Sequence, residues 1–111
     1  MAAFSANITI DRGTNYQSEF TLLNSDGSVV NLTGYTIEAK VKKNPTATTA
    51  VGFSATSVIP TSGQIILSMD AFTTNQLKSG RNYFDVILIS PDGTITKALE
   101  GMVFVKETIS V

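Results

Sequence analysis

The stretch that decides the fold is Tyr35-Thr36-Ile37-Glu38-Ala39-Lys40-Val41-Lys42-Lys43. Apolar side chains fall at every second position up to Val41, and polar or charged side chains fill the positions between them. Successive side chains of a β-strand point to opposite faces, so this alternation predicts a strand with one face on a core and the other in solvent. The lysines are interpreted as part of the solvated face rather than as a basic binding site.

Short runs rich in Val, Ile, Thr, Phe and Tyr recur along the chain. Turn signals separate them at intervals of about ten residues, among them Asp26-Gly27 and Pro91-Asp92-Gly93. Short strands at this spacing are typical of a sandwich or barrel. We expect an all-β sandwich of two sheets with about seven to nine strands. A chain of 111 residues is expected to form one domain over residues 1–111.

One segment breaks the β pattern. Between Asp70 and Lys78 the sequence offers N-cap residues at Asp70 and Thr73, and Gly80 follows as a stop signal. This predicts a short helical turn near residues 70–78 that crosses from one sheet to the other.

The composition limits the chemistry that is available. The chain has no cysteine and no histidine, which excludes disulfides, thiolate chemistry and imidazole catalysis. Eight basic and nine acidic residues give a net charge of −1, so no long-range field attracts nucleic acid or anionic lipid. No apolar run approaches the roughly 18 residues of a membrane span, and the first residues lack the features of a secretion signal. We therefore expect no cofactor, no nucleic-acid partner and no membrane insertion.

Two sets of carboxylates allow a chemical interpretation. A converging pair among Asp85, Glu38 and Glu100 would suit glycoside hydrolysis, although strand carboxylates of a small sandwich usually face solvent. Asp26 and Asp92 would suit calcium, but neither turn has the further oxygen ligands of a calcium loop, and Asp-Gly is a strong hairpin signal. We expect turns at these aspartates, no metal site and no enzyme activity.

Apolar residues on both faces of a predicted strand indicate contact with another surface. Only one face of a sandwich strand points into the core, yet between Asn82 and Ser90 both faces are apolar, with Ile87 and Ile89 on one of them. The run Met102-Val103-Phe104-Val105 raises the same question. Cover by the chain's own termini is the alternative, and the open edges of a sandwich offer further sites for strand pairing. The predicted protein interface consists of Ile87, Ile89, Val103 and Val105.

The run from Leu77 to Val86 resembles the corner before the penultimate strand of immunoglobulin-like domains. In those domains a helical turn, a glycine and an aromatic residue lead into a buried strand. The cysteine pair and core tryptophan of true immunoglobulin domains are absent from this chain. The resemblance implies an immunoglobulin-like arrangement of the two sheets.

A second resemblance extends over nearly the whole chain, and two segments carry most of it: Asn31-Leu32-Thr33-Gly34-Tyr35 and Gly80-Arg81-Asn82-Tyr83-Phe84-Asp85-Val86. The chain is similar to small β-sandwich proteins of tailed bacteriophages, in particular to the N-terminal domain of baseplate upper proteins, which docks onto the tail. Those proteins continue into a long receptor-carrying region, whereas this sequence stops at Val111.

The phage resemblance implies a structural virion component: a tail, baseplate or neck adaptor, or a capsid decoration protein. It would be made in the host cytoplasm without secretion, contact other virion proteins, and form a homo-oligomer or symmetric array in the particle. The alternative is a receptor- or glycan-binding module at a tail tip or cell surface, which would need exposed aromatic side chains grouped on loops.

Overall fold

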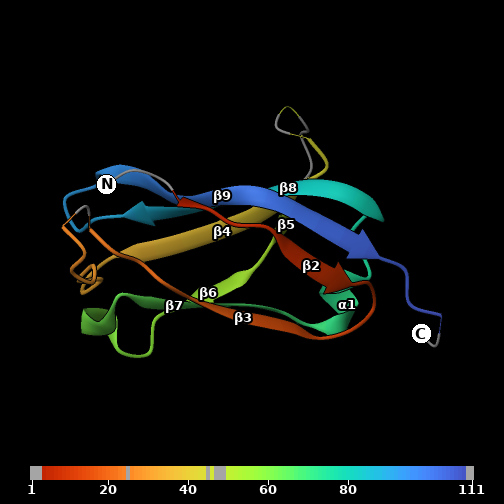
Figure 1. Ribbon diagram of the computed structural model, residues 1–111, viewed down its shortest axis with the longest axis horizontal. Coiled ribbons are helices and arrows are strands. Elements are labelled where there is room, and N and C mark those ends of the chain that lie inside the picture. The colour runs from red at the N-terminus through yellow and green to blue at the C-terminus, as the bar shows by residue number, and fades with distance from the viewer. Residues whose placement is uncertain (1–3, 25, 45, 47–49, 110–111) are drawn as a thin grey trace.

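Two β-sheets pack face to face in the computed structural model, which describes residues 4–24, 26–44, 46 and 50–109 (Figure 1). The larger sheet has the strand order β1-β9-β8-β4-β5, and β2 also pairs with β9. Its strands are β1 (Phe4–Ser5), β2 (Ile8–Asp11), β4 (Thr36–Lys42), β5 (Val51–Gly52), β8 (Gly80–Ile89) and β9 (Ile95–Lys106). The smaller sheet has the order β3-β7-β6, with β3 (Tyr16–Thr21), β6 (Ser54–Thr56) and β7 (Gln64–Met69).

The strand orders match the immunoglobulin arrangement. In that fold the second, fifth and fourth strands lie side by side in one sheet, and the third, sixth and seventh in the other. Here β3-β7-β6 and β4-β8-β9 have these orders, and β2 runs parallel to β9. The predicted all-β, immunoglobulin-like sandwich is confirmed, with nine strands among the described residues.

The predicted helical turn is present but shorter than expected. Helix α1 spans Ala71–Thr74, and the Asp70 side chain caps it by accepting a hydrogen bond from the Thr73 backbone N–H at 2.8 Å. Gly80 does not end this helix; it begins β8 in a left-handed conformation with φ of 96°. A 3₁₀ turn, η1 (Pro60–Ser62), precedes β7 and was not predicted as a helical element. In the described part of the chain no helix has the length and apolar character that crossing a membrane requires.

The corner before β8 is held by Asn82. This side chain is buried, and its Nδ2 donates hydrogen bonds to the backbone oxygens of Lys78 at 2.8 Å and Gly80 at 3.2 Å. In immunoglobulin domains a tyrosine two residues before a core cysteine makes the corresponding bond to upstream backbone. Asn82 precedes the buried Phe84 by two residues and takes that role, while Tyr83 lies half-buried on the opposite face of β8.

The core lies between the sheets, and it contains two residues that were predicted for the surface. Val103 is 0% and Val105 is 1% exposed, so their assignment to a protein interface was wrong. Uninterrupted alternation from Ile95 would put both valines on the outer face. A β-bulge prevents this, because Ile87 pairs with Lys97 and Val86 with Leu99, which leaves Ala98 as an extra residue on β9.

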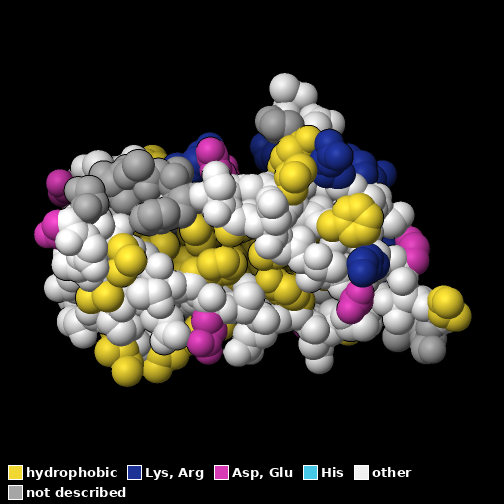
Figure 2. Space-filling model, in the orientation of Figure 1, with side chains coloured by type: hydrophobic (Ala, Val, Ile, Leu, Met, Phe, Trp, Pro, Cys, Tyr) yellow, Lys and Arg dark blue, Asp and Glu magenta, His cyan; other side chains and the backbone are white. Residues whose placement is uncertain are grey.

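The sandwich is open along one side. Strands β2 and β3 run along the side that faces the viewer in Figure 1, but they belong to different sheets. Hydrophobic side chains are visible between the two sheets on this side (Figure 2).

Candidate functional site

The outer face of the larger sheet carries the two isoleucines of the predicted interface. Ile87 and Ile89 lie half-buried on β8, on the opposite face from the buried Val86 and Leu88. Ile89 pairs directly with Ile95 of β9, whose side chain is exposed. These three residues form an isoleucine patch, although a solvated strand face normally carries polar side chains.

A second apolar group lies on the same face and consists of Tyr83, Met102 and Phe104. Tyr83 pairs with Met102 across β8 and β9, and both Met102 and Phe104 are exposed. We call these residues the aromatic patch. The four-residue run of β9 named in the sequence prediction contributes Met102 and Phe104 to this face instead of the two valines, since the bulge turns Met102 and Phe104 outward and the valines inward.

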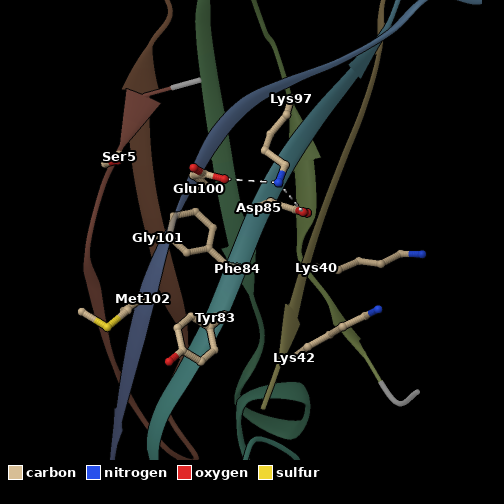
Figure 3. A pocket seen from close by; sticks show the side chains of 10 residues that line it. All are labelled: Ser5, Lys40, Lys42, Tyr83, Phe84, Asp85, Lys97, Glu100, Gly101 and Met102. Carbon is tan, nitrogen blue, oxygen red and sulfur yellow. Dashed lines mark hydrogen bonds and ion pairs between the residues drawn. The ribbon is translucent and has the colours of Figure 1, made fainter. Parts of the chain in front are cut away.

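Asp85, Lys97 and Glu100 form a charged cluster on the same face (Figure 3). In the β8–β9 register these residues lie between the isoleucine patch and the aromatic patch. Asp85 and Glu100 are direct cross-strand neighbours, a placement that would be unfavourable for two carboxylates alone. The Lys97 Nζ lies 3.2 Å from Glu100 Oε2 and 3.9 Å from Asp85 Oδ2, which offsets this repulsion. All three side chains are about half exposed, so the cluster adds little stability.

The sequence raised a catalytic carboxylate pair as an alternative, and its three candidates do share this face. Asp85 and Glu100 come together, whereas Glu38 pairs with Ile87 in the next row of the sheet. Lys97 binds both members of the close pair, and both are open to solvent. The two carboxylates are therefore engaged in ion pairs on an open sheet face, and not placed on either side of a cleft that would hold a sugar ring.

The charged cluster and part of the aromatic patch border a hollow on the outer face. Strand β8 provides its centre, while β4 and β9 provide its sides (Figure 3). Its lining residues are Ser5, Lys40, Lys42, Tyr83, Phe84, Asp85, Lys97, Glu100, Gly101 and Met102.

The two Asp-Gly turns use their carboxylates within the turn. Asp26 Oδ1 accepts hydrogen bonds from the Ser28 hydroxyl at 2.6 Å and from the Ser28 backbone N–H at 2.9 Å. Asp92 Oδ1 accepts bonds from the Ser90 hydroxyl and from the Thr94 backbone N–H. In each turn the hydrogen bond from the serine hydroxyl is the largest cause that lowers the pKa of the aspartate, and the bond from the backbone N–H lowers this pKa further. No group of three or more acidic residues placed to hold a metal ion occurs in residues 4–24, 26–44, 46 and 50–109.

The sequence matches no protein-family model and no curated protein. Among solved structures, an internalin-like protein of Listeria monocytogenes has 16% identity and a TM-score of 0.46, and the match covers 94% of this chain. The chain spans only 28% of the length of that protein. Murine CRIg has 11% identity and a TM-score of 0.44, with 92% of each chain covered. Similarity at this level carries no functional information, and the assignment of the fold rests on the strand order.

Proposed function

We propose that this protein is a non-enzymatic structural subunit of a tailed-phage virion and that it works through contacts made by the outer face of its larger sheet. The observation that carries the contact role is the isoleucine patch of Ile87, Ile89 and Ile95 on that face. Apolar surface of this kind, beside polar groups, is typical of protein-binding sites. The assignment to a phage particle rests on the sequence resemblance to baseplate upper proteins.

The composition of the face supports binding to another folded protein. Isoleucine and aromatic side chains supply area for desolvated contact, and tyrosine and phenylalanine are favoured at interfaces. The charged cluster between them discriminates among partners because a misplaced charge would be left unpaired. The partners we propose are other virion proteins, or copies of this chain in a homo-oligomer or symmetric array, where symmetry multiplies each modest contact.

The test of the virion assignment is immunogold electron microscopy of particles from the lysate in which the chain is made. Label at the tail, baseplate, neck or capsid would support the proposal and locate the subunit. Particles without label, although the antibody binds the free protein and disrupted particles are also negative, would contradict it. Label restricted to the distal tail tip, together with binding of purified protein to host cells, would favour the receptor- or glycan-binding alternative.

A further inference from the structure

The outer edge of β3 has no neighbouring strand in the described structure. Strand β3 pairs with β7 on one side only. In immunoglobulin domains the first strand of the fold lies beside the second in this sheet. Here the N-terminal strands β1 and β2 both pair with β9, in the larger sheet. The position beside β3 is therefore left open by the described strands.

The backbone at this edge offers hydrogen-bonding groups in a regular pattern. The Leu22 N–H donates to the Gly63 oxygen at 2.8 Å, in register with the β3–β7 ladder. Backbone groups of successive strand residues point alternately to the two sides. The backbone groups of Tyr16, Ser18 and Phe20 consequently face β7, and those of Gln17, Glu19 and Thr21 face the open edge.

Side chains beside this edge leave apolar surface uncovered. Tyr16 and Phe20 face the core but are only half-buried, whereas Ile65 and Leu67 on the adjacent strand β7 are 0% exposed. Ile8 on β2, across the opening, is also half-buried. Hydrophobic side chains are visible at this opening in Figure 2. The Ser18 hydroxyl lies between Tyr16 and Phe20 on β3 and accepts a hydrogen bond from the Tyr16 hydroxyl at 2.8 Å. An added strand would therefore find free backbone groups to pair with and a largely apolar surface to cover.

We propose that the β3 edge binds an extended segment of a different polypeptide as an additional antiparallel strand of the smaller sheet. Its backbone would pair with Gln17, Glu19 and Thr21. Alternate apolar side chains, opposite Ser18 and Phe20, would cover the opening between β2 and β3. A lysine or arginine would lie opposite Glu19, which is the one charged residue in the strands of the smaller sheet.

Glu19 also argues against a second copy of this chain as the occupant. Two antiparallel copies of β3 can pair through the backbone groups of Gln17, Glu19 and Thr21 together only in the register that places Glu19 opposite Glu19. That register places two like charges directly opposite each other, which is unfavourable. The proposed edge belongs to a different sheet from the candidate face and does not depend on the virion assignment.

The test uses amide hydrogen exchange of the full chain, followed by NMR, with a synthetic probe. The probe is the acetylated and amidated peptide Thr-Val-Lys-Val-Thr-Val-Thr. Saturating peptide should slow exchange several-fold at Gln17, Glu19 and Thr21, while the β7-bonded amides of Ser18 and Phe20 stay as slow as before. The substitution Glu19→Lys should weaken binding about fivefold, and replacing the peptide lysine by glutamate should restore it. The substitution Glu38→Lys, the same charge change on the larger sheet, should leave binding unchanged.

Three results would overturn the proposal. The first is that millimolar peptide does not slow exchange of the edge amides, although protection of the Ser18 and Phe20 amides shows that the protein is folded. The second is slowed exchange located elsewhere in the chain. The third is protection of the edge amides that increases with protein concentration in the absence of peptide, which would identify a second copy as the occupant.

Discussion

At the scale of single residues, Gly101 has a role that its backbone conformation does not reveal. A Cβ atom at this position would lie 1.6 Å from the Ala6 oxygen and 2.7 Å from the Ala6 carbonyl carbon. The N-terminal segment approaches β9 this closely because the Ala6 N–H donates to the Glu100 oxygen at 2.9 Å. Only glycine leaves room for this contact.

Gly101→Ala is therefore expected to displace the N-terminal segment and to lower the free energy of unfolding by about 1–3 kcal/mol, as overpacking commonly does. Urea denaturation measures this change. The matched control is Gly52→Ala, since a Cβ at Gly52 meets no atom within 4 Å. Equal stability of the two variants would show that the Ala6 segment moves aside without cost.

The turn aspartates give a prediction about pH. Hydrogen bonding lowers the pKa of Asp26 and Asp92 in the folded state, so their contribution to stability is present above the unfolded pKa of about 3.9 and is lost as the pH falls through the lower folded pKa. Ser90→Ala should raise the pKa of Asp92 and leave that of Asp26 low. NMR titration of the carboxyl groups checks this, and equal movement of both pKa values would contradict it.

The same turns predict the effect of chelators. Oδ1 of each aspartate already accepts hydrogen bonds from a serine hydroxyl and a backbone N–H group within the turn, so a calcium ion is not needed to hold either turn. EDTA should leave the melting temperature unchanged in a thermal denaturation experiment. A large decrease that calcium reverses would restore the calcium interpretation.

At the scale of secondary-structure elements, Asn82 fixes the path from α1 into β8. Asn82→Ala removes the donor to the Lys78 and Gly80 oxygens and should lower the free energy of unfolding by about 1–3 kcal/mol. Arg81→Ala, at the exposed neighbouring position, is the control and should change stability much less. Denaturant unfolding of both variants measures the difference, and similar losses would mean that Asn82 does not hold the corner.

Strands bounded by clear turn signals were predictable from sequence. The stretch 35–43 became β4 with its lysines outward, and the strand expected between Asn82 and Ser90 became β8. The bulge was not predictable, because Ala98 and Leu99 are both apolar and nothing in the sequence marks one as extra. That single residue reverses the inward and outward positions beyond it, which explains why Val103 and Val105 were misassigned.

The segment 51–56 illustrates a second limit on prediction from sequence. Val51–Gly52 pairs with β4 in the larger sheet, and Ser54–Thr56 pairs with β7 in the smaller sheet. The chain changes sheets at the buried Phe53, whose N–H donates to the Ala39 oxygen at 2.9 Å. Tertiary pairing decides such a short element, and local propensity does not reveal it.

At the scale of the whole molecule, the chain forms an immunoglobulin-like sandwich without the disulfide and tryptophan of that family. Phe53 instead contacts an aromatic ring of each sheet, with its ring centroid 6.0 Å from that of Tyr16 on β3 and 6.3 Å from that of Phe84 on β8. Aromatic contacts at these distances are favourable. Composition alone could exclude the disulfide, but the aromatic contacts depend on how β3, β8 and the residue between β5 and β6 pack together.

The candidate face was predictable only in part. Ile87 and Ile89 stand out in the sequence because they lie on the second apolar face of a strand that needs only one. Ile95, Met102 and Phe104 join them, and Lys97 reaches the two carboxylates, only through the register that the bulge sets. The contact role of this face stays a prediction.

The most direct test of that role compares Ile87→Lys with Ile66→Lys in assembly. Ile66 is a half-buried isoleucine on the outer face of the smaller sheet, so it receives the same change in a matched setting. Sedimentation of the purified proteins and incorporation into particles measure assembly, and circular dichroism confirms folding. We predict that Ile87→Lys yields a folded monomer that no longer assembles, while Ile66→Lys assembles normally. Normal assembly of folded Ile87→Lys would contradict the proposed contact face, and its failure to fold would show that Ile87 belongs to the core.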